Sequence, residues 1–571
     1  MGNFGKGILQ DKTKYASIKQ RKSQNIIQGV LVMKRFVLLF ILFASFAYGE
    51  ILEQENRRIL LEKREQLEKI FEPMTRERKV ETEWESFLLK IPIQGITVEG
   101  NTLLPSFRIR RWKAANCPLR SEKELKEAMQ TLENLYMEQG YVTTRVSLDL
   151  EKSDFEKGKV TFFVQEGKVE KILYDGKEKP AKTLWTFPWR QNYFLNIRDL
   201  DQGMDNLGED ASFRILPGEE EGKSILEVKR KRTVNIFGEV NYNNMGQKTT
   251  GKHRIRTSVG FKNILGLNET LSGYYQTKLQ RQKKEEDNKN YQISLLLPFQ
   301  YYQFSYQLES SSYLQTIPAL GRKYSATGDT KVQRFGLRRT MHRNEHGKWD
   351  FSVQLALKEI KNYMDDIKLI TGSRRLSIFS LENSYIGRLG GGLFQGNIGV
   401  HFGLRQFGAT KDRELWYHTQ SSPKAQFRKY TLDMSWYRPF ASWHYRGNLA
   451  LQYSNDILHS SERLSLGDET TVRGFQDFGV QGERGFYFRN ELGYDGWKML
   501  RPFIAYDIGE VRRVWKEEGS TSREMLQGIS AGLLFSLGNW ESRLVFSKAI
   551  DFPSSLHIRS HETYISVSYR F

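Results

Sequence analysis

The chain has almost no cysteine and no long apolar segment. Its 571 residues include one cysteine, Cys117, which excludes an intramolecular disulfide and a metal site built from clustered cysteines. The mean hydropathy is −0.58, and the apolar run from Phe36 to Phe46 is too short to cross a bilayer as a helix. These absences exclude a bundle of transmembrane helices. A β-barrel stays possible, because its strands alternate polar and apolar residues.

The positive charge is spread along the whole chain. The net charge is +20, from 87 Lys and Arg against 67 Asp and Glu. A nucleic-acid-binding surface would gather such residues in one patch, so we expect no nucleic-acid partner. Aromatic residues make up 13% of the chain, which favours sheets and the interfacial girdles of membrane barrels.

A secretory signal is predicted near the N-terminus. The basic Met33-Lys34-Arg35 precedes the apolar run, and the small residue Gly49 follows it. This order is typical of a signal peptide, with cleavage after Gly49. We assign residues 1–49 to an N-terminal extension and signal peptide, with Met33 favoured over Met1 as the natural start.

Residues 50–86 are predicted to contain a charged helix and a linker. The apolar stripe of the helix is sparse, and such a stripe is too narrow to form a core alone. The helix therefore either lies in solvent or inserts into a polar cavity of another domain. The stripe consists of Ile51, Ile59, Leu60, Leu67 and Ile70.

Two small α+β units are predicted next, in residues 87–166 and 167–232. Each combines a helix of 3.6-residue period with short alternating strands. In the first unit, a capping box at Ser121 opens the helix and Gly140 ends it. The first unit has strands near Ile93–Val98, Tyr141–Leu150 and Val160–Gln165, and the second has strands near Val169–Tyr174, Phe213–Leu216 and Ile225–Val228 around a helix Ile197–Leu207.

Residues 233–571 keep a period of two and are predicted to form an all-β transmembrane barrel of about 16 antiparallel strands. In one example, Tyr302, Phe304, Tyr306 and Leu308 alternate with polar residues. Outer-membrane barrels alternate short inner turns with long outer loops. The predicted inner turns lie near Phe299-Gln300, Pro439–Ser442 and Gly538-Asn539, and the predicted outer loops near Ser310–Thr330, Gln406–Ala425 and Asp456–Glu483.

No arrangement of residues points to an enzyme. His342 to His346 match the H-x-x-E-H spacing of a zinc site, but that spacing works only on a helix, and this segment falls in a predicted turn. A phosphate-binding glycine loop and a serine nucleophile motif are both absent from the sequence. We therefore expect no enzyme activity, no metal and no cofactor.

The chain resembles the outer-membrane transporters of two-partner secretion, of the haemolysin/adhesin secretion-activation type. The likeness covers nearly all of the chain after the signal peptide and identifies the two α+β units as periplasmic POTRA domains. It rests on Ile96–Asn101, Gly140–Arg145, Leu195–Gly203, Ile215–Gly218, Gly222–Ser224, Val472-Arg473-Gly474-Phe475, Asp507-Ile508-Gly509 and the terminal Phe571.

The resemblance implies roles for particular residues. The segment Val472–Phe475 is expected at the tip of the sixth outer loop, folded into the barrel, with Arg473 bonded to Asp507 beside Gly509 in a water-lined lumen. The family usually has an aromatic residue two positions before that aspartate, whereas this chain has Ala505. Residues expected to contact the partner are Gly100, Asn101, Gly140, Tyr141, Thr143 and Arg145. Tyr569 and Phe571 resemble the signal that the barrel-assembly machinery reads, although an ordinary interfacial strand fits them too.

The resemblance also implies a function. An unfolded exoprotein, haemolysin-like or adhesin-like, would dock on the POTRA domains by strand addition and pass outward through a lumen plugged at rest by the N-terminal helix. The expected location is the outer membrane of a Gram-negative-type bacterium, in contact with lipid. An insertase or assembly chaperone of the same superfamily is the alternative, but it typically has more POTRA domains. A porin or surface adhesin would explain the barrel without the α+β units.

Overall fold

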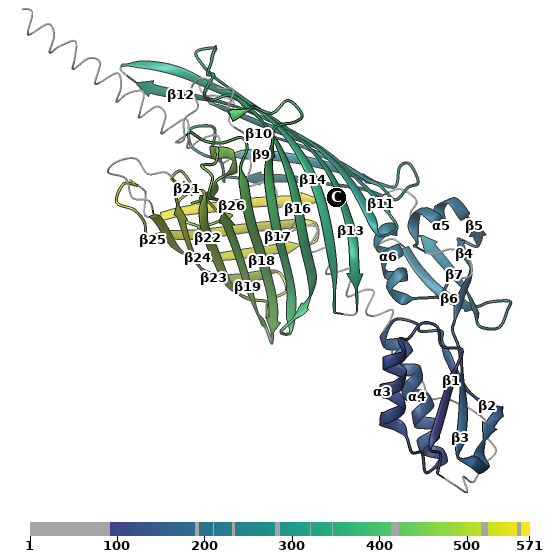
Figure 1. Ribbon diagram of the computed structural model, residues 1–571. Helices are drawn as coiled ribbons and strands as arrows, with labels where there is room; N and C mark the ends of the chain where they lie inside the picture. The colour runs from purple at the N-terminus through teal and green to yellow at the C-terminus, as the bar shows by residue number, and fades with distance from the viewer. Residues whose placement is uncertain are drawn as a thin grey trace, which may run out of the picture.

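The computed structural model of the protein describes residues 92–188, 193–208, 211–230, 235–279, 286–319, 321–344, 346–412, 422–514, 523–556 and 561–571. The predicted signal peptide and the predicted N-terminal helix lie outside these residues. Two small α+β units and one closed barrel make up the described part (Figure 1). Among the described residues, no helix combines the length and the apolar character needed to cross a membrane.

The first α+β unit is a three-stranded sheet with two helices on one face (Figure 1). The Ser121 hydroxyl accepts a hydrogen bond from the backbone N–H of Glu124 at 3.2 Å and caps the longer helix, as predicted. The shorter helix was not predicted. Residues 141–144 form a turn, so the second strand begins at Arg145 rather than at Tyr141. The elements are β1 (Gly95–Glu99), α3 (Ser106–Asn116), α4 (Glu122–Glu138), β2 (Arg145–Asp154), η1 (Phe155–Lys157) and β3 (Lys159–Gln165), in sheet order β1-β3-β2.

The second α+β unit has the predicted helix and strands, with a short additional strand and helix between the first strand and the predicted helix. The sheet order is β5-β4-β7-β6, so β5 and β6 are the edge strands. The elements are β4 (Lys168–Tyr174), β5 (Lys177–Glu178), α5 (Pro180–Thr186), α6 (Ile197–Leu207), β6 (Ala211–Pro217) and β7 (Lys223–Arg230).

The two α+β units are joined by direct contacts. Val142 from the first unit is buried in the core of the second. The backbone N–H of Ile197 donates to the Gly140 carbonyl at 2.8 Å, and the Asn196 side chain donates to the Gln139 carbonyl at 3.1 Å. The junction is therefore a packed interface rather than a free linker.

The second unit also contacts the inner end of the barrel. The side chains of Gln202 and Asn206, on α6, both donate to the Gln300 carbonyl, at 3.1 Å and 2.8 Å. Arg343 forms an ion pair with Asp205 of the same helix. Because Gln300 and Arg343 lie at two successive inner turns, these bonds fix one face of α6 against the barrel rim.

Sixteen long antiparallel strands and the two-residue β15 close into a barrel within the described part of the chain, which confirms the predicted fold class. The strands are β8 (Asn235–Asn243), β9 (Arg254–Lys262), β10 (Thr270–Lys278), β11 (Asp287–Phe299), β12 (Tyr302–Ala319), β13 (Arg322–Arg343), β14 (Gly347–Met364), β15 (Ile367–Lys368), β16 (Arg374–Leu389), β17 (Gly392–Leu404), β18 (Arg428–Phe440), β19 (Trp443–Tyr453), β22 (Arg484–Tyr494), β23 (Leu500–Arg512), β24 (Arg523–Leu537), β25 (Trp540–Asp551) and β26 (His561–Arg570).

The three predicted inner turns are present, but one predicted outer loop is wrong. The stretch Ser310–Thr330 is mostly strand, because β12 and β13 pair as far as Ala319 and Arg322. These strands extend beyond the apolar band of the barrel, where both of their faces can be polar. That loss of alternation made the stretch look like a loop. The long connections after β17 and β19 agree with the prediction.

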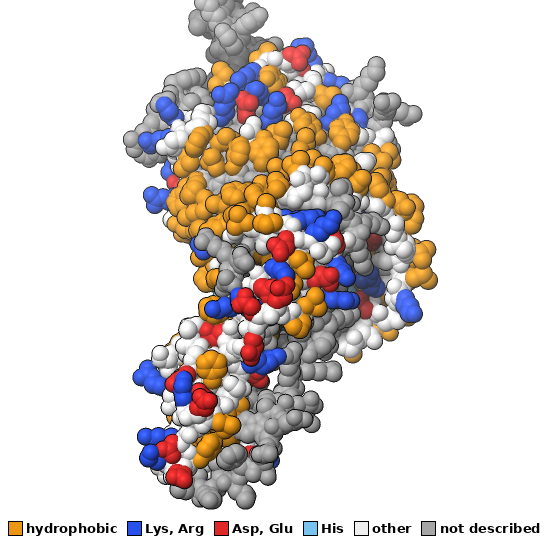
Figure 2. Space-filling view, turned by 90° about the vertical axis from the view of Figure 1, so that its right-hand side faces the viewer, with side chains coloured by type: hydrophobic (Ala, Val, Ile, Leu, Met, Phe, Trp, Pro, Cys, Tyr) orange, Lys and Arg blue, Asp and Glu red, His pale blue; other side chains and the backbone are white. Residues whose placement is uncertain are grey.

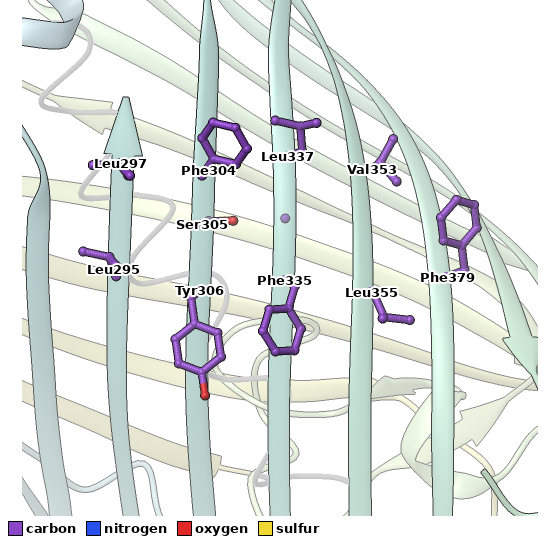
Figure 3. Close-up of a pocket in the computed structure, with 11 residues that line it drawn as sticks. Leu295, Leu297, Phe304, Ser305, Tyr306, Phe335, Leu337, Val353, Leu355 and Phe379 are labelled. Carbon is purple, nitrogen blue, oxygen red and sulfur yellow. The ribbon is translucent and has the colours of Figure 1, made fainter. Parts of the chain in front are cut away.

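Exposed apolar side chains occur on strands from β8 to β26. On the face in Figure 2 they form a belt across the barrel, with charged side chains above and below it. Part of the belt is a shallow apolar groove across strands β11 to β16, lined by Leu295, Leu297, Phe304, Phe335 and Phe379 among others (Figure 3). Such a surface would be unfavourable in water, whereas it suits contact with hydrocarbon. The barrel therefore has the outer surface of a membrane protein.

Candidate functional site

The connection between β19 and β22, residues 454–483, folds back into the barrel. It is the sixth outer loop, and it contains η3 (Ser460–Glu462) and a small hairpin of β20 (Leu464–Leu466) and β21 (Val480–Gly482). At the predicted tip, Val472 and Arg473 are 0% exposed and Phe475 is 1% exposed. A fully buried arginine needs partners for its charge and its donors, and these partners define the site.

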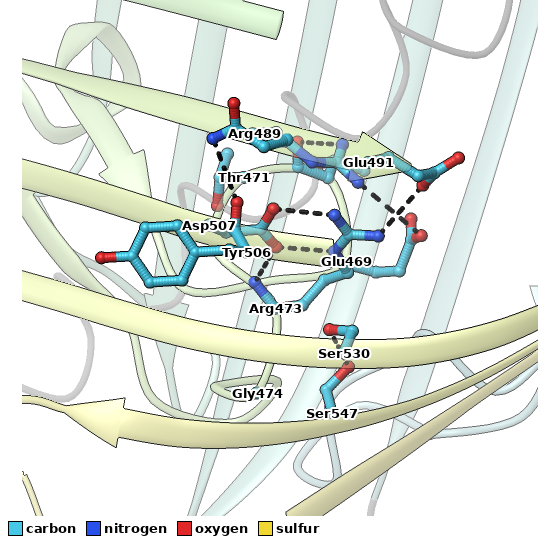
Figure 4. A network of polar contacts seen from close by, with 12 residues as sticks. Glu469, Thr471, Arg473, Gly474, Arg489, Glu491, Tyr506, Asp507, Ser530 and Ser547 are labelled. Atoms are coloured by element: carbon cyan, nitrogen blue, oxygen red, sulfur yellow. Dashed lines mark hydrogen bonds and ion pairs between the residues drawn. The ribbon is translucent and has the colours of Figure 1, made fainter. Parts of the chain in front are cut away.

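Arg473 is bound to the barrel wall by a two-pronged ion pair. Its Nε and Nη2 atoms lie 2.6 Å and 2.7 Å from the two carboxylate oxygens of Asp507 on β23 (Figure 4). The Arg473 backbone N–H also donates to this carboxylate, at 3.2 Å. Asp507 faces inward, because Ile504 and Tyr506 are 60% and 40% exposed on the outer surface. The predicted contact is therefore present, in the geometry that makes arginine–carboxylate pairs strong.

Further charges surround this pair, and sequence reasoning missed them. Glu491, on β22, lies 3.3 Å from Arg473 Nη1 and 3.1 Å from Arg543 Nη2. Arg543 is also 3.7 Å from Glu469 of the loop itself. Arg489 donates to the carbonyl of Thr470 at 2.7 Å. Arg489, Glu491 and Arg543 sit at inward strand positions. The alternation along each strand therefore places them in the lumen, but it does not indicate which charges meet.

The tip is buried rather than water-lined, which corrects the prediction. Asp507 is 0% exposed, as is Arg473. A buried ion pair that loses one member leaves the other charge without compensation. Removing either member is therefore expected to destabilise the loop more than breaking a solvated pair would.

Glycines allow the close approach of the tip to the wall. Gly474 has φ of +104°, and a Cβ there would lie 2.9 Å from the backbone nitrogen of Ala549. A Cβ on Gly528 would collide with the carbonyl oxygen of Arg473, and one on Gly509 would lie 3.0 Å from Val472 Cγ2. The absence of a side chain at Gly509 leaves room for Val472 of the loop, and the role of Gly509 as a wall partner stays a prediction.

Tyr564 of the last strand places an aromatic ring and its hydroxyl against the loop tip. It is buried in one cluster with Phe503, Ala505 and Val545. Its hydroxyl accepts a hydrogen bond from the backbone N–H of Gly474 at 3.1 Å. Ala505 and Tyr564 therefore belong to one apolar cluster although their strands are distant in sequence, a relation that no local pattern indicates.

The loop is also bonded to the first outer connection, through two residues that follow the tip. Gln476 donates through one nitrogen to the carbonyls of Asn244 and Gly246, at 2.6 Å and 2.7 Å. Asp477 pairs with Lys248 at 2.8 Å. The first connection follows β8, which pairs with β26 to close the barrel. The loop therefore contacts both sides of the closing seam.

The six predicted partner-contact residues lie in the first α+β unit. Most of them shape its turns or pack against its core. Gly100 and Gly140 have φ of +78° and +95°. The Asn101 side chain accepts from the Leu104 N–H at 3.0 Å. Tyr141 packs against the core of the unit, and Thr143 abuts Gly167. Arg145 has a side chain that is 47% exposed and lies 3.4 Å from Glu133. Their role in partner contact stays a prediction.

Three residues of other predicted motifs lie at the inner end of the barrel. Tyr569 and Phe571 are exposed, and the Tyr569 ring lies 4.9 Å from the ring of Trp540. The backbone of Phe571 exchanges two hydrogen bonds with Gly238, at 2.9 Å and 3.0 Å. Between β13 and β14, His346 sits in the turn after β13, so the H-x-x-E-H spacing is not on a helix.

Known families match three parts of the chain. Residues 222–535 match the haemolysin secretion/activation protein family ShlB/FhaC/HecB. Residues 91–167 match the ShlB-type POTRA domain, and residues 168–213 match a further POTRA domain family.

Individual relatives agree with the family matches. The outer membrane transporter CdiB of Escherichia coli is 31% identical over 486 residues, which cover 81% of this chain and 80% of the relative. The hemolysin transporter protein ShlB of Serratia marcescens is 28% identical, covering 77% of this chain and 79% of the relative. The solved structure of CdiB from Escherichia coli superposes with a TM-score of 0.79 at 28% identity, covering 91% of this chain and 98% of that one.

The barrel and the two α+β units thus agree with these relatives in sequence and in fold. The chain belongs to the haemolysin secretion/activation family of outer-membrane β-barrel transporters, and its two α+β units are the periplasmic POTRA domains of that family.

Proposed function

We propose that this protein recognises an unfolded secreted partner in the periplasm through its POTRA domains and passes it through the barrel lumen to the cell surface. The observation that carries the proposal is the inward loop, whose tip is bound to the lumen wall through Arg473 and Asp507. A closed barrel with a detachable obstruction suits a channel that opens for a large cargo. A cargo that folds outside supplies the driving force, so no nucleotide is required.

Open sheet edges support recognition by strand addition. In the described part of the chain, no strand pairs with the outer edge of β2 or of β6. An extended peptide can add to such an edge through backbone hydrogen bonds, which tolerate varied sequences. The β6 edge exposes Ser212, Arg214 and Leu216, so it offers polar and apolar contacts to an incoming strand.

The bonds between α6 and the inner end of the barrel support delivery of a bound partner into the lumen. α6 belongs to the same POTRA domain as β6, and it is bonded to the inner turns through Gln202, Asn206 and Asp205. A strand captured on β6 would therefore be held at a constant position relative to the barrel mouth. We propose that residues 51–69, which lie outside the described residues, plug the lumen at rest.

The names of the relatives support secretion over membrane-protein insertion. CdiB is named an outer membrane transporter and ShlB a hemolysin transporter protein. We propose by analogy a large haemolysin-like or adhesin-like exoprotein as the cargo here. Two POTRA domains, rather than a longer array, also favour secretion over the insertase alternative.

Site-specific photo-crosslinking tests the proposed recognition. A photoreactive residue at Arg214, on the β6 edge, should crosslink to a co-expressed candidate exoprotein during export. The matched control is Lys123, whose side chain is 86% exposed on α4, and it should give little product. Equal crosslinking at both positions, or none at Arg214 while export proceeds, would contradict recognition at this edge.

A further inference from the structure

The base of the sixth loop makes a second set of buried ion pairs, far from the tip in sequence. Glu462, the last residue of η3, is 4% exposed. Its Oε1 lies 2.7 Å from Lys358 Nζ, and its Oε2 lies 3.0 Å from Lys429 Nζ. Ser460, two residues earlier, accepts a hydrogen bond from Arg374 Nη2 at 3.3 Å. One carboxylate of the loop thus pairs with two lysines of the wall, and a neighbouring hydroxyl bonds a third cation.

The two lysines belong to a wall different from the one that binds the tip. Lys358 lies on β14 and Lys429 on β18, each at an inward position beside an outward neighbour. Asp507 and Glu491 lie on β23 and β22. Lys429 is the second residue of β18, at its outer end, whereas Lys358 and Asp507 both lie within the outer half of their strands. The loop therefore acts as a brace between two different walls of the lumen.

The charges at the two ends of the brace are opposite in sign. At the tip, the loop presents the cation Arg473 to a wall with Asp507 and Glu491. At the base, it presents the anion Glu462 to a wall with Lys358, Lys429 and Arg374. Neither contact can replace the other, because exchanging them would bring like charges together in a buried site.

The backbone around Glu462 is bonded as well. Gln452, on β19, donates to the Glu462 carbonyl at 3.0 Å. Arg463, the next residue, pairs with Glu483 on the returning arm of the loop at 2.7 Å. The base is thus a closed ring of contacts between both arms and the wall, so movement of Glu462 would be transmitted to the whole loop.

We propose that Glu462 is a positioning residue that anchors the base of the sixth loop to strands β14 and β18, so that the loop leaves the lumen only when this anchor and the Arg473–Asp507 pair are both broken. These two anchors set the position of the loop whether or not a partner is present. Only its consequence for secretion, namely that cargo must displace both anchors, rests on the proposed function.

Current through the purified protein in a planar lipid bilayer tests this anchor without any cargo. Glu462→Gln keeps the shape of the side chain and removes the charge. We expect the fraction of time in high-conductance states to rise about tenfold, since two charge-assisted hydrogen bonds are lost. Arg473→Ala serves as the reference for a loop released at the tip.

The matched control is Glu359→Gln, the neighbour of Lys358 on the same strand. Glu359 faces the other side of β14, where it pairs with Arg375 at 2.9 Å, so its loss should leave the current unchanged. Glu462→Lys alone would face both Lys358 and Lys429. A Lys358→Glu/Lys429→Gln/Glu462→Lys triple variant instead pairs the new lysine with a glutamate, and it should bring the current back toward the wild-type value. A merely structural role for Glu462 would not give this rescue.

A wild-type current in Glu462→Gln would overturn the proposal, as would a triple variant whose current is no closer to the wild-type value than that of Glu462→Lys. If Glu462→Gln does not assemble as a barrel resistant to SDS at room temperature, Lys358→Gln and Lys429→Gln, which remove the same contacts from the wall, carry the same comparison. Loss of secretion with an unchanged current would contradict the anchor while leaving the proposed transport intact.

Discussion

Arg473 and Asp507 meet inside the barrel through two hydrogen bonds of 2.6 Å and 2.7 Å, although 34 residues separate them in the sequence. One residue belongs to an outer loop and the other to a strand in the barrel wall. The pair therefore converts a connection that could lie at the surface into an internal element of the channel.

Two substitutions of Arg473 should distinguish the effect of its charge from the effect of its two-pronged hydrogen bonding. Arg473→Ala leaves Asp507 buried without its partner, a change that costs about 3 to 5 kcal/mol in buried pairs. Arg473→Lys keeps the charge but cannot bond both carboxylate oxygens in the same plane. We expect both variants to insert in the membrane, with secretion lost in Arg473→Ala and reduced in Arg473→Lys, measured as exoprotein in the medium. Wild-type secretion by Arg473→Ala would contradict the role assigned to the loop.

Gly528→Ala should displace the tip without touching any charge. The added methyl group would collide with the Arg473 carbonyl oxygen, so the backbone of the loop must move. We expect greater access of a thiol reagent to a cysteine placed at Val472, with Cys117 replaced by serine. Gly372→Ala is the control, because the nearest atoms to its Cβ lie at an ordinary 3.4 Å. Equal labelling in the two variants would contradict the close packing of the tip.

Tyr564→Phe should moderately weaken the attachment of the loop tip to the barrel wall. It removes the acceptor for the Gly474 N–H, and an unpaired buried donor costs about 1 to 3 kcal/mol. We expect a barrel of normal mobility on SDS gels, with a lower temperature for the heat-dependent shift in mobility. Tyr242→Phe, whose hydroxyl bonds His253 at 2.7 Å in the first hairpin, is the comparison. An equal shift in the two variants would show that Tyr564 has no special relation to the loop.

Asp205→Asn should loosen the second POTRA domain from the barrel. The substitution removes the charge that pairs with Arg343 and with Lys348, the latter at 3.7 Å. Spin labels on α4 and at the inner turn after β18 should then give a broader distance distribution. A swap of Asp205→Arg with Arg343→Asp should narrow it again. A distribution that Asp205→Asn leaves unchanged would indicate that the remaining bonds to Gln300 suffice.

Phe571→Ala should lower the amount of assembled barrel. The backbone of Phe571 pairs with Gly238, and its ring covers that glycine, where a Cβ would collide with it. We expect less heat-modifiable protein in the outer membrane fraction and an unchanged secretion rate per assembled barrel. Trp540→Ala removes an exposed ring of the neighbouring inner turn and is the control. An equal loss in both variants would favour an ordinary interfacial aromatic over an assembly signal.

Much of the fold follows from local patterns in the sequence. The period of two along β8 to β26 indicates the barrel, since each strand has one face toward the lumen and one apolar face. The helix after Ser121 is equally clear, because its cap and its apolar spacing agree. The helix α3 was missed because its segment, Ser106–Asn116, has four basic residues and only two buried apolar ones.

The candidate site was predictable only in part. Arg473 and Asp507 were found through a family motif, whereas Glu491, Glu462 and Tyr564 have no local signature. Each is an ordinary residue at an inward or loop position, and it gains its partner only when the barrel closes and brings distant strands together. Pairings of this kind depend on strand order and register, which alternation alone does not specify.

Export of a partner is the most direct test of the central claim that this barrel transports a protein through a lumen controlled by its sixth loop. A candidate exoprotein would be co-expressed with the wild-type protein or with Arg473→Ala, and its amounts in the medium and in the periplasm would be compared at equal levels of assembled barrel. We predict export to the medium with the wild type and retention in the periplasm with the variant. Equal export in both, or export in the absence of the barrel, would contradict the claim.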